Sequence, residues 1–327
     1  MKLILDEIEK DIIDIRAKNF RYVSTSLVPS RHDTSLTFER GEDKVGKEID
    51  SCVLYVDIRN SVELNRKHHT QTMGRIYTAF SKAMLKIAKH HGGYVRNIIG
   101  DRVMIVFPKD NCYTNAVNCA ISIYHIAHDL INKVFEEVNF ECGIGIDYGN
   151  LKIVKVGLHR RGSEGFDNKN LVWVGYPANI ASRLTDVANK SVEKRKFKVE
   201  YYPYNFFGYL GFLRPFSPLR QVPTSTDKLY SDTPKVDILT GEEFTKNISF
   251  SDVSGISYSG GKLIRFDKSE SKIDFPPILM TSRVYSGFKA ANPTRDDVSG
   301  KFWKKIDNHN IKNVDVDVYG GTVNWVI

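Results

Sequence analysis

Two aspartates lie at positions where a carboxylate is energetically unfavourable unless it is solvated, paired with a positive side chain or bound to a cation. Asp57 comes at the end of an apolar run, 51–56, and burying an unpaired charge is strongly unfavourable. Asp101 lies at a Gly-Asp step between two further apolar runs. Carboxylate oxygens are ligands that Mg²⁺ prefers, and two bound cations can clamp the attacking and leaving oxygens of a phosphoryl displacement. Singly, each aspartate is better explained as a turn residue; jointly, they predict a site for divalent metal ions.

The residues that follow Asp57 suit the phosphate groups of such a reaction. Arg59, Asn60 and Ser61 form a polar turn, and Ser61 can cap a helix that begins there. Backbone N–H groups at the start of a helix bind phosphate readily. We therefore expect Asn60 and Ser61 to contact the β- and γ-phosphates of a nucleotide.

The apolar periodicity predicts elements that bring the two aspartates together. It indicates a strand at 51–58, a helix at 73–88, a hairpin of 94–99 with 102–107, a helix at 113–137, a hairpin of 140–149 with 151–157, a strand at 171–176 and a helix at 178–187. This order is typical of a ferredoxin-like α+β sandwich. In such a sheet the first strand neighbours the first hairpin, so Asp57 and Asp101 would meet at one edge.

The flanks divide the chain into four expected segments. Residues 1–49 would form a helix, over 3–16, and a connecting arm, and the helix would pack on its own domain or on a second protomer. Residues 50–190 would form the catalytic core. Crowded aromatics and prolines in 191–275 predict an irregular, mostly β insertion, and nothing in it names a ligand. Residues 276–327 would return to the core with a strand, a helix and closing strands.

Charge and cysteine content narrow the class of protein without deciding it. The formal charge of +8 over 327 residues favours anionic partners, which include nucleotides, nucleic acid and acidic membranes. The four cysteines contain no CxxC pair, which argues against a zinc or disulfide-exchange site. Acidic residues interrupt the N-terminus, and no apolar run reaches the length of a membrane span. We therefore expect a cytoplasmic protein without direct membrane contact.

Four sequence blocks resemble the successive signature blocks of class III adenylyl and guanylyl cyclases. They are DIRNSV (57–62), VRNIIGDRVMIVF (95–107), GIGIDYG (143–149) and VGYPANIASRL (174–184). One block alone would be weak, but four in the family's order and spacing cover residues 50–190. The resemblance implies a nucleotidyl cyclase, which converts a nucleoside triphosphate into a 3′,5′-cyclic monophosphate and diphosphate.

The resemblance implies roles for the matching positions. Asp57 and Asp101, with the backbone carbonyl of Ile58, would bind two Mg²⁺ or Mn²⁺ ions. Asn179 would orient the ribose, and Arg183, four positions later and so on the same helix face, would stabilise the transition-state phosphate. In this family the two halves of each site come from opposite protomers, which implies a homodimer. A late lysine also contacts the triphosphate, and the candidates are Lys304, Lys305 and Lys312.

Two departures from the family concern the nucleotide base. Adenylyl cyclases carry Lys and guanylyl cyclases Glu where this chain has Asn97, and adenylyl cyclases carry Asp at the position of Val172. Asn97 can donate and accept hydrogen bonds toward cytosine or uracil. Tyr55 shares a strand face with Asp57, and it either fills the space that a smaller base leaves or is a core tyrosine.

The residues at these base positions resemble those of the prokaryotic pyrimidine cyclases of anti-phage Pycsar systems. Those enzymes make cyclic CMP or cyclic UMP as an alarm signal for an effector protein. The substrate that we predict is therefore UTP or CTP, with a slight preference for UTP. Three alternatives remain: an adenylyl cyclase with an unusual base pocket, a non-catalytic nucleotide-binding module and a nucleic-acid binder. The intact metal and phosphate residues argue against the second, and the family resemblance argues against the third.

Overall fold

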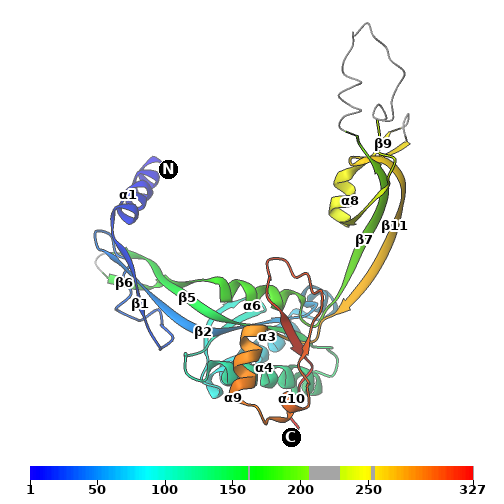
Figure 1. Ribbon diagram of the computed structural model, residues 1–327. Helices are drawn as coiled ribbons and strands as arrows, with labels where there is room; N and C mark the ends of the chain where they lie inside the picture. Colours follow the sequence, from blue (N-terminus) through cyan, green and yellow to red (C-terminus); the bar gives the residue numbers. More distant parts are fainter. Residues whose placement is uncertain (161–162, 206–228, 252–254, 327) are drawn as a thin grey trace. The chain divides into compact units, whose positions relative to one another are not determined.

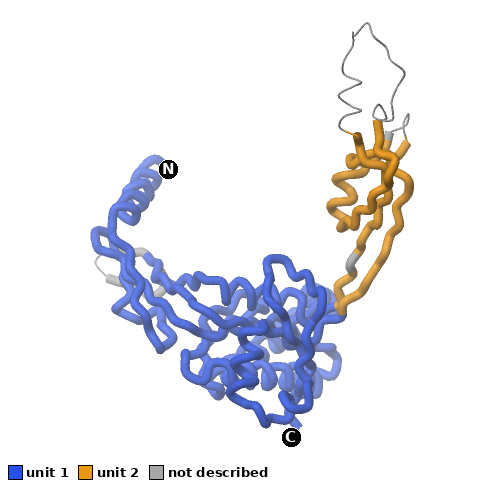
Figure 2. The backbone as a smooth tube through the Cα atoms, viewed as in Figure 1, with its two compact units in different colours: residues 1–190, 274–327 blue, residues 191–273 orange. Residues whose placement is uncertain are grey.

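The computed structural model describes residues 1–160, 163–205, 229–251 and 255–326. The chain divides into two compact units, shown in different colours in Figure 2. Unit 1 comprises Met1–Lys190 and Asp274–Ile327, and unit 2 comprises Ser191–Ile273. No helix among the described residues is long and apolar enough to cross a membrane.

Unit 1 is built on a sheet that has nine strands within the described residues (Figure 1). The strands are β1 Phe20–Ser24, β2 Lys44–Ile58, β3 Tyr94–Ile99, β4 Arg102–Val106, β5 Cys142–Arg160, β6 Ser163–Val174, β12 Ile278–Thr281, β13 Lys304–Lys305 and β14 Val318–Gly321. The main order is β13-β14-β12-β5-β2-β4-β3, with β1 beside β2 and β6 beside β5. All pairs are antiparallel except β1 with β2 and β12 with β5.

The helices of unit 1 connect these strands. They are α1 Lys2–Ala17, α2 Ser61–Lys67, α3 Thr70–His90, α4 Cys112–His125, α5 Asn132–Val134, α6 Tyr176–Val187, α9 Ser282–Ala291 and α10 Asp296–Ser299. The succession β2, α3, β3, β4, α4, β5 with the sheet order β5-β2-β4-β3 is the ferredoxin-like arrangement. The α+β class with an antiparallel sheet and helices, predicted from the sequence, is confirmed.

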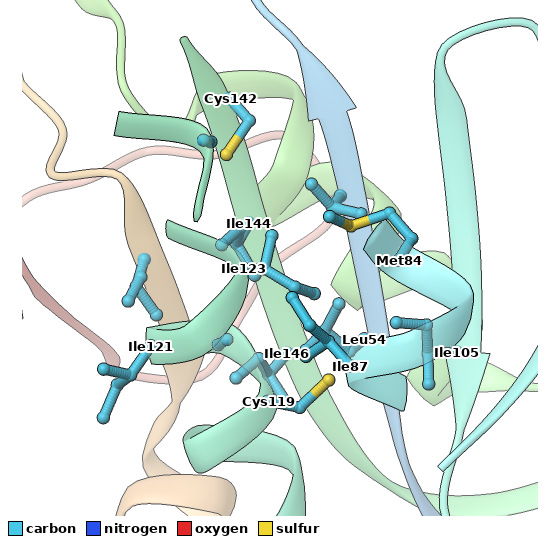
Figure 3. Close-up of a cluster of buried hydrophobic side chains, with 14 of the residues drawn as sticks. Leu54, Met84, Ile87, Ile105, Cys119, Ile121, Ile123, Cys142, Ile144 and Ile146 are labelled. Atoms are coloured by element: carbon cyan, nitrogen blue, oxygen red, sulfur yellow. The ribbon is translucent and has the colours of Figure 1, made fainter. Parts of the chain in front are cut away.

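Helices cover both faces of the central strands. On one face α3, α4 and α9 contribute to a large core, in which Leu54 and Ile146 of the sheet meet Ile123 of α4 (Figure 3). On the other face α6 and the segment before β2 pack on the sheet, and Met104 meets Ala181. Since consecutive side chains of a strand face opposite sides, the uninterrupted apolar run in β2 fills both cores.

The second long helix of the core differs from its expected form. In place of one helix over 113–137, α4 continues into a π-helix, Ile126–Ile131, and then into the short α5. A π-helical turn holds more residues than an α-helical turn, so the side chains beyond it leave the buried face. Leu130 and Val134, which the helical spacing places on that face, are 47% and 73% exposed.

The hairpin expected at 140–157 is also different, because these residues form the single strand β5. Its partner β2 begins at Lys44, well before the predicted strand, and the ladder between them runs on through Asn150 to Ile153. A tyrosine, a glycine and an asparagine that look like a turn are therefore held in an extended strand. The hairpin partner of β5 is β6.

The N-terminal segment contributes to the sheet. β1 pairs in parallel with the first residues of β2, so the arm expected up to residue 49 contains two strands. The predicted helix is present as α1, but none of its side chains is buried. Its contacts with the rest of unit 1 include polar ones, such as the hydrogen bond that Asp14 accepts from the Gly41 N–H.

Unit 2 has a regular sheet within its described residues. The strands β7 Ser191–Pro203, β8 Lys235–Thr240, β9 Ile248–Ser251, β10 Gly255–Tyr258 and β11 Gly261–Asp274 take the order β8-β7-β11-β10-β9. The helix α8, Gly241–Asn247, begins with a capping box between Thr240 and Glu243. The small core of unit 2 contains Val199, Tyr201, Ile248 and Tyr258. Residues 206–228 and 252–254 of the expected insertion lie outside the described residues.

Candidate active site

The two aspartates singled out by the sequence lie at one end of neighbouring strands. Asp57 is the last residue but one of β2, and the ladder pairs it with Arg102 of β4 and with Gly143 of β5. Asp101 precedes Arg102 in the turn of the β3–β4 hairpin. Gly100 gives this turn its left-handed residue, with φ +60°. The structure thus brings the backbones of the two aspartates to adjacent positions on the sheet.

Arg102 connects Asp57 to α6. Its Nη2 donates to the Asp57 carboxylate at 3.0 Å and to Asp186 Oδ1 at 2.6 Å, and its Nη1 donates to Ser182 Oγ at 3.0 Å. Burial by itself would lower the pKa of Arg102, but the bonds to Asp186 and Asp57 raise it above its ordinary value. Sequence reasoning missed this residue, because its place opposite Asp57 depends on the pairing of β2 with β4, which lie far apart in the chain.

The donor set at Asp57 and Asp101 fits a hard divalent cation. Two carboxylates and the Ile58 carbonyl supply oxygen ligands only, as Mg²⁺ and Mn²⁺ prefer. Arg102 has a second carboxylate partner in Asp186, so Asp57 can exchange this guanidinium for a cation without leaving an unpaired charge. Within the described residues no cluster of three or more His, Cys, Asp and Glu side chains is present. Further ligands would therefore come from water or from substrate phosphates, as is common for Mg²⁺.

The polar turn after Asp57 begins a helix, α2, as the sequence predicts, but Ser61 is its first residue and not its N-cap. Asn60 is the N-cap residue and has a left-handed φ of 54°, a conformation that asparagine tolerates. Ser61 opens the helix, whose first N–H groups have no intrahelical partner. Arg59 is buried and donates to the carbonyl of Thr185 in α6. This turn is therefore fixed to the same helix as Arg102.

A row of three residues crosses the sheet beside the metal-site aspartates. Tyr55 pairs with Met104, and Met104 pairs with Asn97, so all three side chains lie on the face that α6 covers. Tyr55 is partly buried against the core on that face, and burial raises the pKa of its hydroxyl. Asn97 is exposed, as a residue that meets a ligand must be.

Asn97 lines a cleft of about 460 Å³ whose opposite wall comes from β6 and the N-terminal arm. The β6 residues in this wall are Asn170, Leu171 and Trp173. Val172 lies between the last two, faces the other side of the strand from them and is 43% exposed. Within one chain the structure thus places Asn97 together with the neighbours of Val172 and not with Val172 itself.

α6 carries Asn179 and Arg183 on its exposed side. The helix packs closely on β5, where a Cβ on Gly145 would meet the backbone of Ala181 and Thr185. Thr185 Oγ1 also donates to the carbonyl of Tyr55 at 3.1 Å. The Arg183 side chain is 48% exposed, and its Nη1 lies 3.8 Å from Asp186. Both candidate catalytic side chains are therefore held on a fixed helix and point away from their own sheet.

The three late lysines differ in their contacts. Lys305 Nζ lies 2.8 Å from Asp317 Oδ2, and this pair raises the lysine's pKa. Lys304 and Lys312 are exposed. All three belong to the chain segment between α10 and β14, and the structure does not single out one of them.

Comparison with known proteins identifies the class that this fold and site define. Residues 45–192 match the family model "Adenylate and Guanylate cyclase catalytic domain". The matched segment contains Asp57, Asp101, Asn179 and Arg183 and resembles a class III cyclase catalytic domain. Among curated proteins the chain is similar to the uridylate cyclase of Rhodovulum sp. (strain MB263), with 27% identity over 214 residues, or 60% of this chain and 84% of the relative. It is also similar to the uridylate cyclase of Burkholderia cepacia, with 29% identity over 192 residues, or 57% of this chain and 79% of the relative.

The chain is also similar to solved structures of adenylyl and guanylyl cyclases. The adenylyl cyclase CyaB from P. aeruginosa matches 86% of this chain and 97% of its own, with 14% identity and a TM-score of 0.47. The guanylyl cyclase Cya2 matches 86% of this chain and 95% of its own, with 12% identity and a TM-score of 0.47.

Proposed function

We propose that the protein is a pyrimidine nucleotide cyclase that converts UTP or CTP into the 3′,5′-cyclic monophosphate and diphosphate, with UTP preferred. The observation that carries this proposal is the exposed amide of Asn97 in the row with Met104 and Tyr55. An amide donates and accepts at once, as the edge of uracil or cytosine requires. The uridylate cyclases among the relatives support the choice of UTP.

The proposed reaction is an intramolecular displacement at the α-phosphorus. The 3′-oxygen forms a bond to this phosphorus, the bond to the bridging oxygen of the β-phosphate breaks, diphosphate leaves with the electron pair, and the hydroxyl proton passes to water. Asp57, Asp101 and the Ile58 carbonyl would hold two Mg²⁺ or Mn²⁺ ions. Bound there, such ions neutralise phosphoryl charge and favour loss of the hydroxyl proton.

The remaining candidate residues would bind and orient the substrate. Asn60 and Ser61 at the start of α2 would bind the triphosphate, and Asn179 would orient the ribose. The guanidinium of Arg183 would stabilise the charge that develops on the phosphoryl oxygens. Because Asn179 and Arg183 point away from their own sheet, we propose that they act with the metal-site aspartates of a second copy, in a homodimer with shared sites.

Product identification tests the proposal directly. The purified protein is incubated with ATP, GTP, CTP and UTP separately in the presence of Mn²⁺, and products are identified by mass. We expect cyclic UMP or cyclic CMP, and we expect Asp57→Ala to abolish it. Faster conversion of ATP or GTP than of both pyrimidines would contradict the assignment of the base. Failure to form any cyclic nucleotide, with full binding of UTP, would contradict catalysis.

We further propose that the cyclic product is a second messenger in anti-phage defence and that an effector protein reads it. This step rests on the resemblance at the base positions. Bacteria that express the protein together with an effector protein that responds to the cyclic product should then resist phage, as measured by plaque counts. The Asp57→Ala variant should lose this resistance; equal resistance of the variant would separate defence from cyclase activity.

A further inference from the structure

The exposed helix α1 has an apolar stripe that no described residue of its own chain covers. None of its residues is buried. The large apolar side chains of the helix range from 46% to 86% exposed; Leu5 is 56%, Ile8 46%, Ile12 60% and Ile15 57% exposed. Met1, just before the helix, is 92% exposed. A stripe of this kind on a fixed helix marks an interaction surface.

The spacing of these residues is that of a coiled-coil seam. From Met1 to Ile15 the steps are four, three, four and three residues, so Leu5 and Ile12 take heptad position a, and Met1, Ile8 and Ile15 take position d. Two heptads are short for a helix pair that stands alone in water. The seam therefore suits a contact that adds to a larger interface between two copies of the chain.

The charges beside the seam fix the orientation of such a pair. Asp11 takes position g and Arg16 position e of the next heptad, so two parallel copies bring Asp11 of each helix to Arg16 of the other. An antiparallel pair that keeps all four apolar layers would place Glu9 against Glu9, Asp11 against Asp11 and Lys2 against Arg16. The parallel arrangement thus brings Asp11 to an opposite charge, whereas the antiparallel one places like charges together at all of these positions.

α1 is joined tightly to the catalytic unit. Asp14 accepts hydrogen bonds from the Gly41 N–H at 3.0 and 3.1 Å, and its carboxylate lies 3.6 Å from Lys44 Nζ at the start of β2. The bond from Gly41 lowers the pKa of Asp14. Only Lys18 and Asn19 separate α1 from β1, which pairs with β2. A partner bound to α1 would thus be linked through β1 to β2, the strand that carries Asp57.

An anionic lipid surface is a poorer partner for this helix. Between Lys2 and Ala17 the chain has five acidic residues, Asp6, Glu7, Glu9, Asp11 and Asp14, and three basic ones, Lys2, Lys10 and Arg16. Helices that lie on membranes carry mainly Lys and Arg on the polar face. The acidic balance would repel anionic headgroups.

We propose that α1 pairs with α1 of a second copy as a two-heptad parallel coiled coil. The inference deepens the homodimer of the proposed function, but it concerns a contact outside the catalytic residues. Its tests therefore use cross-linking and sedimentation, which register this contact whether or not the protein makes a cyclic nucleotide.

Disulfide trapping of the full-length protein tests the contact and its direction. The native cysteines are all buried, so an added cysteine dominates mild oxidation. Leu5→Cys should give a covalent dimer, because position a faces its own counterpart in a parallel pair. Leu3→Cys, on the outer side of the same helix, is the control and should not. A covalent link between Leu5→Cys and Ile15→Cys chains, without a Leu5→Cys self-link, would show an antiparallel pair and overturn the proposal.

Sedimentation equilibrium tests the contribution to dimerisation. The seam variant I8E/I12E should dimerise at least tenfold more weakly than the control L3E/I13E, which places the same charges off the seam. Asp11→Arg and Arg16→Asp should each weaken dimerisation about fivefold, and the double swap should restore it. Circular dichroism would verify that each variant keeps its fold. Equal dimerisation of seam and control variants, or flotation of the protein with phosphatidylserine vesicles in place of dimerisation, would overturn the proposal.

Discussion

At the scale of single residues, Arg102 is the hydrogen-bond donor that connects the Asp57 carboxylate to α6. It donates to Asp57 on β2 and to Asp186 and Ser182 on α6. Hydrogen bonds of this charge-assisted kind are shorter and stronger than neutral ones. The same guanidinium therefore screens a candidate metal ligand and fastens the helix that carries the candidate transition-state arginine.

Replacing Arg102 with Ala should destabilise the protein by about 1–2 kcal/mol, since two carboxylates lose a charged partner in a half-buried place. The free energy of unfolding in urea measures this loss. Arg102→Lys should recover only part of it, because an ammonium cannot span three acceptors as a guanidinium does. Arg75→Ala, on the exposed side of α3, is the matched control and should change stability by less than about 0.5 kcal/mol. A loss at Arg102 no larger than at Arg75 would contradict the bridging role.

His91 should make the fold sensitive to acid. Its Nε2 lies 2.9 Å from Ser122 Oγ, which also accepts from Trp325 Nε1 at 2.9 Å, and burial, with His90 nearby, lowers the pKa of His91 to about 4. The native state then binds fewer protons than the unfolded state between pH 6.5 and 4. Stability is complete above pH 6.5 and is lost as the pH falls toward 4, by about 1–3 kcal/mol.

His91→Gln keeps a hydrogen-bonding side chain but cannot be protonated, so its unfolding free energy should depend less on pH in that window. Chemical denaturation at pH 7, 6, 5 and 4 measures the slope. His69→Gln serves as the control, because His69 is the N-cap of α3 and His91 is the C-cap of the same helix. An unchanged slope in the His91 variant would assign the acid sensitivity to other groups.

Sequence patterns predict where the candidate site residues lie on strands, turns and helices better than they predict which side chains contact them. A strand end for Asp57, a hairpin turn for Asp101 and one helix face for Asn179 and Arg183 all agree with the structure, because each depends on local periodicity. Arg102 was missed, since its partners lie 45 and 84 positions away in the chain. The position of Val172 relative to Asn97 also depends on distant pairing, because β6 joins the sheet beside β5 and β3 joins it beside β4.

At the scale of elements, the closeness of α6 to β5 positions the site. A Cβ on Gly145 would lie 2.5 Å from Thr185 N and still closer to the carbonyl of Ala181. Those atoms are backbone and cannot turn aside. Any side chain at this position must therefore push the helix away from the sheet, and Asn179 and Arg183 with it.

Gly145→Ala should destabilise the protein by about 2–3 kcal/mol, as overpacking does, and should lower kcat for cyclisation more than it changes KM. Gly74→Ala is the control: it lies in α3 with nothing within 4 Å of the added atom, so it should stabilise by about 1 kcal/mol. Thermal unfolding and initial rates measure both effects. A Gly145 variant that behaves like the Gly74 variant would show that α6 can move without consequence.

Element type was predictable where a period persisted, and it was not where tertiary pairing overrode a local signal. The 3.6-residue pattern of α3 and the short β3–β4 hairpin agree with the structure. The apparent turn around Asn150 does not, because β2 offers a continuous ladder partner on its side. The π-helix after α4 could not be predicted, because the spacing of apolar residues there fits an ordinary α-helical repeat.

At the scale of the whole molecule, unit 2 is inserted into unit 1 between two chain positions that are hydrogen-bonded to each other. The Phe275 N–H donates to the Lys190 carbonyl at 2.9 Å, and the Asn189 N–H donates to the Pro276 carbonyl at 3.0 Å. The chain thus leaves and re-enters unit 1 at hydrogen-bonded neighbours. Unit 2 also has its own core.

Removing residues 191–273 and joining Lys190 to Asp274 through a short Gly-Ser linker should leave unit 1 folded. The Tm should change by no more than about 4 °C, which corresponds to ~1 kcal/mol in a domain of this size. Deletion of 186–273 is the control; it also removes the hydrogen-bonded exit residues and should give an aggregating chain. If the first deletion also aggregates, unit 2 is part of the folding unit of the catalytic domain.

The paired exit and entry strands have a consequence for how this protein can evolve. A core that closes on itself at the junction can gain, exchange or lose an insert through one in-frame genetic event, since joining nearby ends costs little chain entropy. Selection can then change the insert rapidly while the catalytic domain stays constant. The junction at Lys190 and Phe275 thus allows different inserted domains to be accepted without changes to the residues of the candidate active site.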